Sequence, residues 1–194
     1  MATVWPIAKR GEHMTRKELE NVFWTATVMC LALDPASEDE FVQQRVRKSW
    51  PTTETGSTNW KRDENVVFLR ITPWNDEIGR YADSSYYFDQ DTQLYRERVD
   101  FTKSHQIHFL CYGPDSYDDA ETIRIGILRA NIRQFLQKNR LGIMPHIREP
   151  IQMSEQDETG EWWERYDLTV YCYENVTKDY EIGTIEVAPN VITI

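Results

Sequence analysis

Alternating and helical hydrophobic patterns meet in residues 104–142, which carry the clearest local signals in the chain. Residues 104–112 alternate as a strand does, with Ile107, Phe109 and Cys111 on one face and His108, Leu110 and Tyr112 on the other. Apolar side chains on both faces are typical of a strand that is covered on both sides. Gly113 and Pro114 then end the strand, because proline cannot donate to a ladder and glycine permits a tight turn.

A long helix is predicted to follow, over residues 116–139. Ser116 is its expected N-cap, and Asp119 occupies the position of a capping-box acid. Acidic residues at its start and basic residues at its end suit the helix dipole, and Gly142 fits the stop. One core-facing line recurs at helical spacing: Ala120, Ile123, Ile127, Ala130 and Gln134. Leu128, Ile132, Phe135 and Leu136 widen it to a core-facing stripe.

A second helix is predicted over residues 15–33, nearer the N-terminus. Thr15 and Glu18 form a capping-box pattern at its start, and Asp34-Pro35 ends it. Residues 1–14 show no clear period and are expected to form an N-terminal arm. Residues 15–194 then make a single domain, since one core typically serves about 100–200 residues.

Several shorter segments read as strands or as connections. The alternating strands are residues 65–72, 94–101 and 162–173, and residues 182–187 and 191–194 are short β-prone runs. Residues 43–49 fit a strand, which we favour, although the acids after Ser37 also resemble a helix start. The expected connections are a polar loop at 51–64, a Tyr-rich loop at 74–90, an edge strand or extended segment at 143–153, an acidic turn at 154–160 and a turn at 175–178. The fold class is therefore α+β, a mixed and largely antiparallel sheet flanked by two main helices, 15–33 and 116–139.

Charge and cysteine usage narrow the function classes. The formal net charge is −10, which argues against a surface that grips nucleic acid through clustered Lys and Arg. Cys30, Cys111 and Cys172 are far apart and odd in number, so we interpret them as buried free thiols of a reducing compartment. The N-terminus does not resemble a signal peptide. The longest nearly apolar run, residues 22–33, is too short for a bilayer that needs about 20 residues, so no membrane contact is expected.

Few residues point to catalysis or metal binding. His105, His108 and Cys111 have a metal-like spacing, but on a strand His108 faces away from the other two, so the three cannot converge. His13 and His146 have no local partner. The dinucleotide, P-loop, HExxH and GxSxG patterns do not occur. We therefore predict no catalytic residue, cofactor or metal ligand.

Aromatic residues give more information. Trp162 and Trp163 are adjacent in a predicted strand, so only one of them can face the core. The other needs a helix of the same chain or a neighbouring subunit to cover it.

Residues 104–176 also resemble a known family. The pattern is a strand ending in YGPDSYDDAETIR, a helix ending in LQKNRLGI, a proline-interrupted segment and then EWWERYDLTVYCYENVT. It is similar to the bacteriophage neck or tail terminator family, and the SWP and VVFLRIT segments at 49–51 and 66–72 extend the resemblance from about residue 50 to the C-terminus. The helix at 15–33 fits the family more loosely.

The resemblance implies a structural virion protein that forms a ring, commonly a hexamer. Such a ring caps the tail tube, joins it to the neck or head-completion (connector) protein and to the tail sheath where one exists, and lets DNA pass through its lumen. It implies localisation to the virion tail and neck after assembly in the host cytoplasm, and no catalytic residue.

An acidic lumen would repel DNA, and loop acids are the expected lining, either Asp83, Asp89 and Asp91 or Glu155, Asp157 and Glu158. The alternatives are a head-closure, adaptor or tail completion protein, an enzyme with a dispersed active site, and a monomeric binding module.

Overall fold

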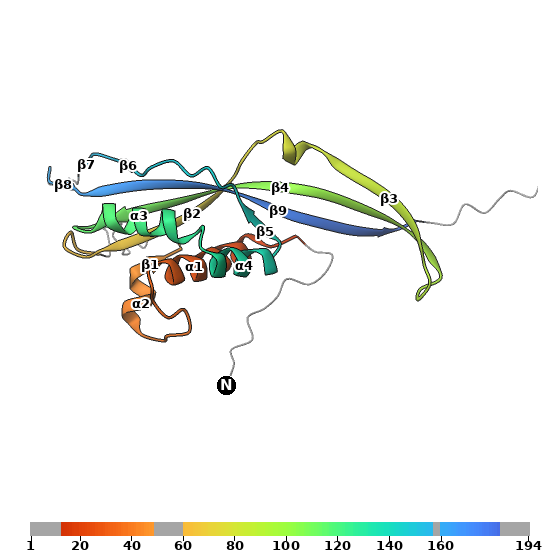
Figure 1. Ribbon diagram of the computed structural model, residues 1–194, viewed down its shortest axis with the longest axis horizontal. Helices are drawn as coiled ribbons and strands as arrows, with labels where there is room; N and C mark the ends of the chain where they lie inside the picture. Colours follow the sequence, from red (N-terminus) through yellow and green to blue (C-terminus); the bar gives the residue numbers. More distant parts are fainter. Residues whose placement is uncertain (1–12, 49–59, 157–159, 183–194) are drawn as a thin grey trace, which may run out of the picture.

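Two long antiparallel strands form the spine of the protein. The computed structural model describes residues 13–48, 60–156 and 160–182. In it β4 (Leu94–Tyr112) and β9 (Arg165–Glu181) pair without interruption from Arg96 opposite Glu181 to Tyr112 opposite Arg165. The two strands span the length of the elongated molecule (Figure 1).

The remaining strands extend this spine on both sides. The main path of the sheet runs β1-β2-β4-β9-β5, while β3 pairs with β4 and β6 pairs with β9 off the path. Only β1 and β2 are parallel, and every other described pair is antiparallel. The bounds are β1 Val46–Arg47, β2 Val66–Pro73, β3 Ala82–Asp89, β5 Leu141–Ile143 and β6 Ile151–Gln152, with a separate ribbon of β7 Glu155–Gln156 and β8 Trp162–Trp163.

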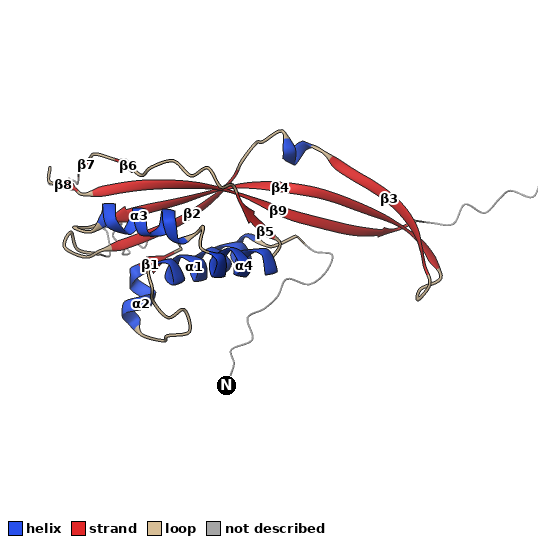
Figure 2. Ribbon diagram, in the orientation of Figure 1, coloured by secondary structure: helices blue, strands red, loops and turns tan. Residues whose placement is uncertain are grey.

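The helices lie on one face of one half of this sheet (Figure 2). They are α1 (Arg16–Cys30), α2 (Glu40–Arg45), α3 (Ser116–Gly126) and α4 (Ala130–Lys138), with the 3₁₀ turn η1 (Ile78–Arg80) near the opposite face. Buried side chains of α1, α3 and α4 pack against Ile107, Phe109 and Cys111 of β4. The predicted α+β class and its largely antiparallel sheet are confirmed.

The predicted start of the first helix is also confirmed. Thr15 accepts a hydrogen bond from the Glu18 amide, and the Glu18 side chain accepts one from the Thr15 amide. Met14, at the end of the segment predicted as an arm, is buried in the core.

The single helix predicted over 116–139 is wrong, because the chain forms α3 and α4 with a break at residues 127–129. Gly126 brings α3 against α1 so closely that a Cβ there would lie 3.0 Å from the Sγ of Cys30. Arg129 then turns toward the end of α1 and donates to the Cys30 carbonyl at 3.2 Å. These tertiary contacts decide the break, and local helix propensity does not show them. The prediction that Ala130 and Gln134 face the core is wrong, because α4 begins after the break and both residues are exposed.

The predicted capping roles of Ser116 and Asp119 are wrong as well. Asp115 occupies the N-cap, and the buried Ser116 hydroxyl has no hydrogen-bond partner among the described residues. Asp119 instead accepts two bonds from Arg45, at 2.5 and 2.6 Å, which join α2 to α3.

Three further expectations fail where tertiary pairing overrides local signals. The strand favoured at 43–49 is wrong over most of its length, because Asp39 caps the helix α2 before β1 begins. The loop at 74–90 contains β3. The turn at 175–178 lies inside β9, where Val176 is buried opposite Phe101.

Some of the other predicted segments are found in the structure, and others lie outside the described residues. The strand at 65–72 is β2, and the strands at 94–101 and 162–173 are parts of β4 and of β8 with β9. The segment at 143–153 holds the end of β5 and the short β6. Most of the loop at 51–64, residues 157–159 of the acidic turn and nearly all of the runs at 182–187 and 191–194 are outside the described residues.

The face of the sheet away from the helices carries a small aromatic core of its own. Trp60 packs on Phe68, Tyr112 and Trp163, with ring centroids 4.6 to 5.8 Å apart. Trp162 is 62% exposed. The prediction that only one of the two adjacent tryptophans faces a core is confirmed.

Candidate functional site

A three-stranded arm projects beyond the layer of helices (Figure 1). It consists of β3, residues 94–103 of β4 and residues 174–181 of β9, and is called the β-arm below. The arm exists because β4 and β9 are far longer than α1, α3 and α4 together can cover. An alternating pattern therefore continues along both strands after the helices have ended.

One face of the β-arm is aromatic. It continues the face that carries Ile107 and Phe109 in the core, since the β4–β9 register runs on without a bulge and side chains alternate along a strand. Tyr86 is 70% exposed, Tyr95 58% and Tyr180 48%. Its apolar members are Tyr86 and Phe88 of β3, Tyr95, Val99 and Phe101 of β4, and Val176 and Tyr180 of β9.

No described helix covers this aromatic face (Figure 2). The rings of Phe88 and Tyr95 pack on each other, with centroids 5.1 Å apart, but both residues remain exposed. Contiguous exposed apolar surface on a soluble protein usually marks a contact with another protein. The face is therefore the strongest candidate for an interaction surface.

The opposite face of the β-arm is charged, and part of it is neutralised within the chain. Arg96 pairs with Asp89 and Arg98 pairs with Asp179, each at 2.9 Å. The guanidinium of Arg98 also lies over the Tyr87 ring, 4.9 Å from its centroid. The hydrogen bond from Arg98 lowers the pKa of Asp179. This face is thus ordered by its own ion pairs.

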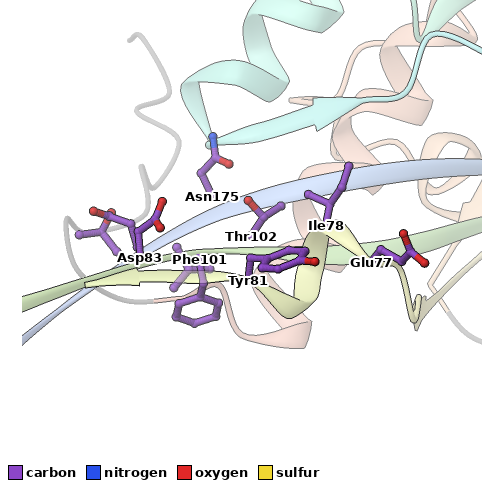
Figure 3. A pocket seen from close by; sticks show the side chains of 10 residues that line it. Glu77, Ile78, Tyr81, Asp83, Phe101, Thr102 and Asn175 are labelled. Atoms are coloured by element: carbon purple, nitrogen blue, oxygen red, sulfur yellow. The ribbon is translucent and has the colours of Figure 1, made fainter. Parts of the chain in front are cut away.

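A shallow hollow of about 560 Å³ lies where η1 passes over the base of the β-arm. Figure 3 shows Asp83, Thr102 and Asn175 on the side of the strands opposite to Phe101. Ile78 and Tyr81 stand at its edge and are 54% and 78% exposed. No described side chain that lines the hollow is basic.

A buried carboxylate anchors the base of the arm. Glu174, 2% exposed, accepts hydrogen bonds from the Met14 amide at 2.7 Å and from His105 Nε2 at 2.8 Å. Burial alone would raise the pKa of Glu174, but the bonds from His105 and Met14 outweigh it, so the pKa lies below its ordinary value. The network holds the first described turn of chain against β4 and β9.

The three residues with metal-like spacing do not converge, as predicted. His105 binds Glu174, and His108 lies on the other face between Thr72 and Thr169. Burial lowers the pKa of His108 and raises that of Cys111. The described residues contain no group of three or more potential metal ligands. Cys30, Cys111 and Cys172 are buried free thiols, as predicted, while the reducing compartment stays a prediction.

The two groups of acids expected in a lumen fall in opposite halves of the molecule (Figure 1). Asp83 and Asp89 lie on β3, and Asp91 lies in the exposed turn before β4. Glu155 lies on β7, while Asp157 and Glu158 are outside the described residues. A subunit whose long axis pointed along a ring radius would bring only one of the two groups to a lumen.

The aromatic face is the part of the site that sequence reasoning missed. The residues at 81–88 stood out as an aromatic loop, but the pairing of Tyr86 and Phe88 with the strand at 94–101 was not predicted. The period-two spacing of Tyr86 and Phe88, directly before the alternating run, is the signal that could have found it.

These features are typical of a protein that binds other proteins. An α+β domain extends an uncovered aromatic arm, and its histidines and buried thiols are spread through the fold. A model of the phage neck terminator family matches residues 17–194, and the chain belongs to that family. A comparison with curated protein sequences found no match.

Membership of the family indicates the general role of the protein and its location in the virion. The protein is a structural component of the phage neck and so of the virion. The match includes α1 as well as the segment from residue 50 onward, so the helix that fitted the resemblance loosely belongs to the family pattern. No described helix is long and apolar enough to cross a membrane.

Proposed function

We propose that the protein is a neck terminator whose subunits close into a ring, six in number, on the head-proximal end of the tail tube. The observation that supports this most directly is the uncovered aromatic face of the β-arm. Burial of apolar area contributes about 25 cal/mol per Å², so this face is a strong site for a neighbouring subunit or for the tube. Its tyrosines and phenylalanines are residue types enriched at such contacts.

A ring subunit needs two different contact surfaces, because each copy meets its two neighbours through unlike patches. The long axis of this protein separates the β-arm from the end that bears Trp162, which is 62% exposed. These two apolar surfaces, far apart on one subunit, suit contacts with two different partners. In this proposal the ring also binds a neck or head-completion protein, and the tail sheath where one exists, and it assembles in the host cytoplasm.

The overall charge of −10 suits the passage of DNA through a ring without adhesion. Like charges repel, and an acidic wall offers no release of counterions to favour binding. We infer that one of the two acidic ends, near Asp91 or near Glu155, faces the lumen. The role is structural, and the proposal assigns no catalytic step.

Electron microscopy of the protein with purified tail tubes tests this function. Rings docked at one tube end, with tube length fixed, are the expected result. A sample without tubes shows whether rings form alone. Binding to neck or portal complexes but not to tubes would assign the protein to the head-closure class instead, and binding to neither would refute the proposal.

A further inference from the structure

In one stretch of this acidic chain, every charged residue is basic. All six Asp, Glu, Lys and Arg residues between positions 122 and 148 are basic, so the rest of the chain carries −16 to give the net charge of −10. The six are Arg124, Arg129, Arg133, Lys138, Arg140 and Arg148. The local net charge is thus opposite in sign to that of the rest of the chain, and we ask which surface this positive charge contacts.

The outer surface of α4 carries two of these cations, Arg133 and Lys138. Ile132 and Leu136 of α4 are buried in the core, which leaves Arg133, Gln134, Gln137 and Lys138 exposed. Arg133 and Lys138 make no ion pair within the described residues. By contrast, Arg124 is held by Glu121 and Arg129 by carbonyls of α1. We call Arg133, Gln134, Gln137 and Lys138 the basic face of α4.

The hollow at the base of the β-arm has complementary chemistry. Asp83 stands directly opposite Asp100 in the β3–β4 register, and like charges placed directly opposite destabilise a strand pair. Glu77 adds a third carboxylate, and Ile78 and Tyr81 add exposed apolar surface at the same edge. An unfavourable cross-strand pair of carboxylates becomes favourable when a cation from outside binds between them.

The two surfaces lie on opposite sides of the sheet. Figure 1 shows α4 below the β4–β9 spine and η1, which borders the hollow, above it. One copy cannot bring its own α4 to its own hollow across the sheet. A second copy can, and a contact of this kind repeats head to tail.

We propose that the basic face of α4 of one copy docks into the hollow formed by η1 and the β-arm of the next copy. Arg133 and Lys138 meet Asp83, Asp100 and Glu77, while the tyrosine and isoleucine at the edge pack on the stems of the basic side chains. The inference rests on the proposed ring and names the surfaces that close it. A second copy is favoured over DNA because two exposed cations on a strongly acidic protein bind a polyanion weakly.

Paired charge reversals test this contact. The pocket variant is Asp83→Lys/Asp100→Lys, and the helix variant is Arg133→Glu/Lys138→Glu. The control is Glu38→Lys/Asp63→Lys, which changes the net charge as much as the pocket variant does at exposed positions away from the hollow. Ring formation by the full chain is measured by mass photometry and by electron microscopy, alone and on tail tubes, at low and high salt.

Each reversed variant alone should assemble at least about tenfold more weakly than wild type, because like-charge contacts oppose docking. An equimolar mixture of the two should assemble again, since each interface then joins unlike charges, and its rings should hold the two variants in alternation. Assembly of the wild type should weaken at high salt. The control should assemble as wild type does.

The negative results can be told apart, because each would contradict a different claim. Normal assembly of both variants, or no recovery in the mixture, would overturn the docking inference while leaving the ring intact. A helix variant that assembles normally but loses binding to a short DNA duplex would assign α4 to DNA and would also overturn it. Absence of wild-type rings with and without tubes would refute the proposed function itself.

Discussion

At the scale of single residues, Glu174 is the least exposed charged residue of the described structure. It is buried, and it accepts hydrogen bonds from the Met14 amide and from His105. A carboxylate with two such donors is stable in a buried position because the donors replace the water that it loses. This residue joins the start of the folded chain to the base of the β-arm.

Replacement of Glu174 by glutamine should destabilise the protein by about 1–3 kcal/mol at pH 7, because a charge-assisted acceptor of two hydrogen bonds is lost. The measurement is chemical denaturation monitored by tryptophan fluorescence. Glu181→Gln, at the exposed end of the same strand, is the control and should change the unfolding free energy by less than about 0.5 kcal/mol.

The loss of stability caused by Glu174→Gln should depend on pH. The folded-state pKa of Glu174 is below its ordinary value of 4.5, so ionised Glu174 stabilises the fold above that value. This stabilisation is lost as the pH falls through the lowered folded-state pKa. The difference in unfolding free energy between wild type and Glu174→Gln should therefore become smaller at acidic pH. Equal stability of the two proteins at pH 7 would contradict the role given to Glu174.

Local residue chemistry was predictable only where both partners are close in sequence. The Thr15–Glu18 capping box has both members within one helical turn and was predicted correctly. Asp119 was given a local capping role, but its partner Arg45 lies 74 positions away. Nothing in the helix-start pattern distinguishes an acid that caps from one that pairs with a distant arginine.

At the scale of elements, tertiary contacts decided where strands and helices end. The alternating runs of β2 and β4 were predicted because their side chains sort cleanly by face. β3 was missed since its serines and aspartates resemble a loop, and only its pairing with β4 makes it a strand. The turn-like residues 175–178 remain in β9 because Val176 is buried opposite Phe101.

The break between α3 and α4 gives a test at this scale. Gly126→Ala places a Cβ 3.0 Å from both Cβ and Sγ of Cys30, so Cys30 must give way by a few tenths of an ångström. The unfolding free energy should fall by about 1–3 kcal/mol, the usual effect of overpacking. Thermal and chemical unfolding measure it.

Gly142→Ala is the matched control, because a Cβ at Gly142 meets nothing within 4 Å. It should leave the unfolding free energy within about 0.5 kcal/mol of wild type. Equal effects of the two substitutions would show that the close approach of α3 to α1 is not what makes Gly126 necessary.

At the scale of the whole molecule, one sheet serves two purposes. The half covered by α1, α3 and α4 supplies the core, and the half that projects carries the aromatic face that we propose binds other proteins. The resemblance seen in the sequence named the right family, and the fold class followed from the alternating and helical patterns. The β-arm itself could not be predicted, because it depends on how far β4 and β9 extend beyond the helices.

The central claim is that the aromatic face of the β-arm is an assembly surface of a neck terminator. Its most direct test is ring formation on tail tubes by Tyr86→Ser/Tyr95→Ser, counted by electron microscopy against wild type. Phe41→Ser is the control, since it removes a ring that is 60% exposed on α2. The account predicts that the double variant folds with wild-type stability but occupies tube ends at least about tenfold less. Full occupancy of tube ends by a folded double variant would contradict it.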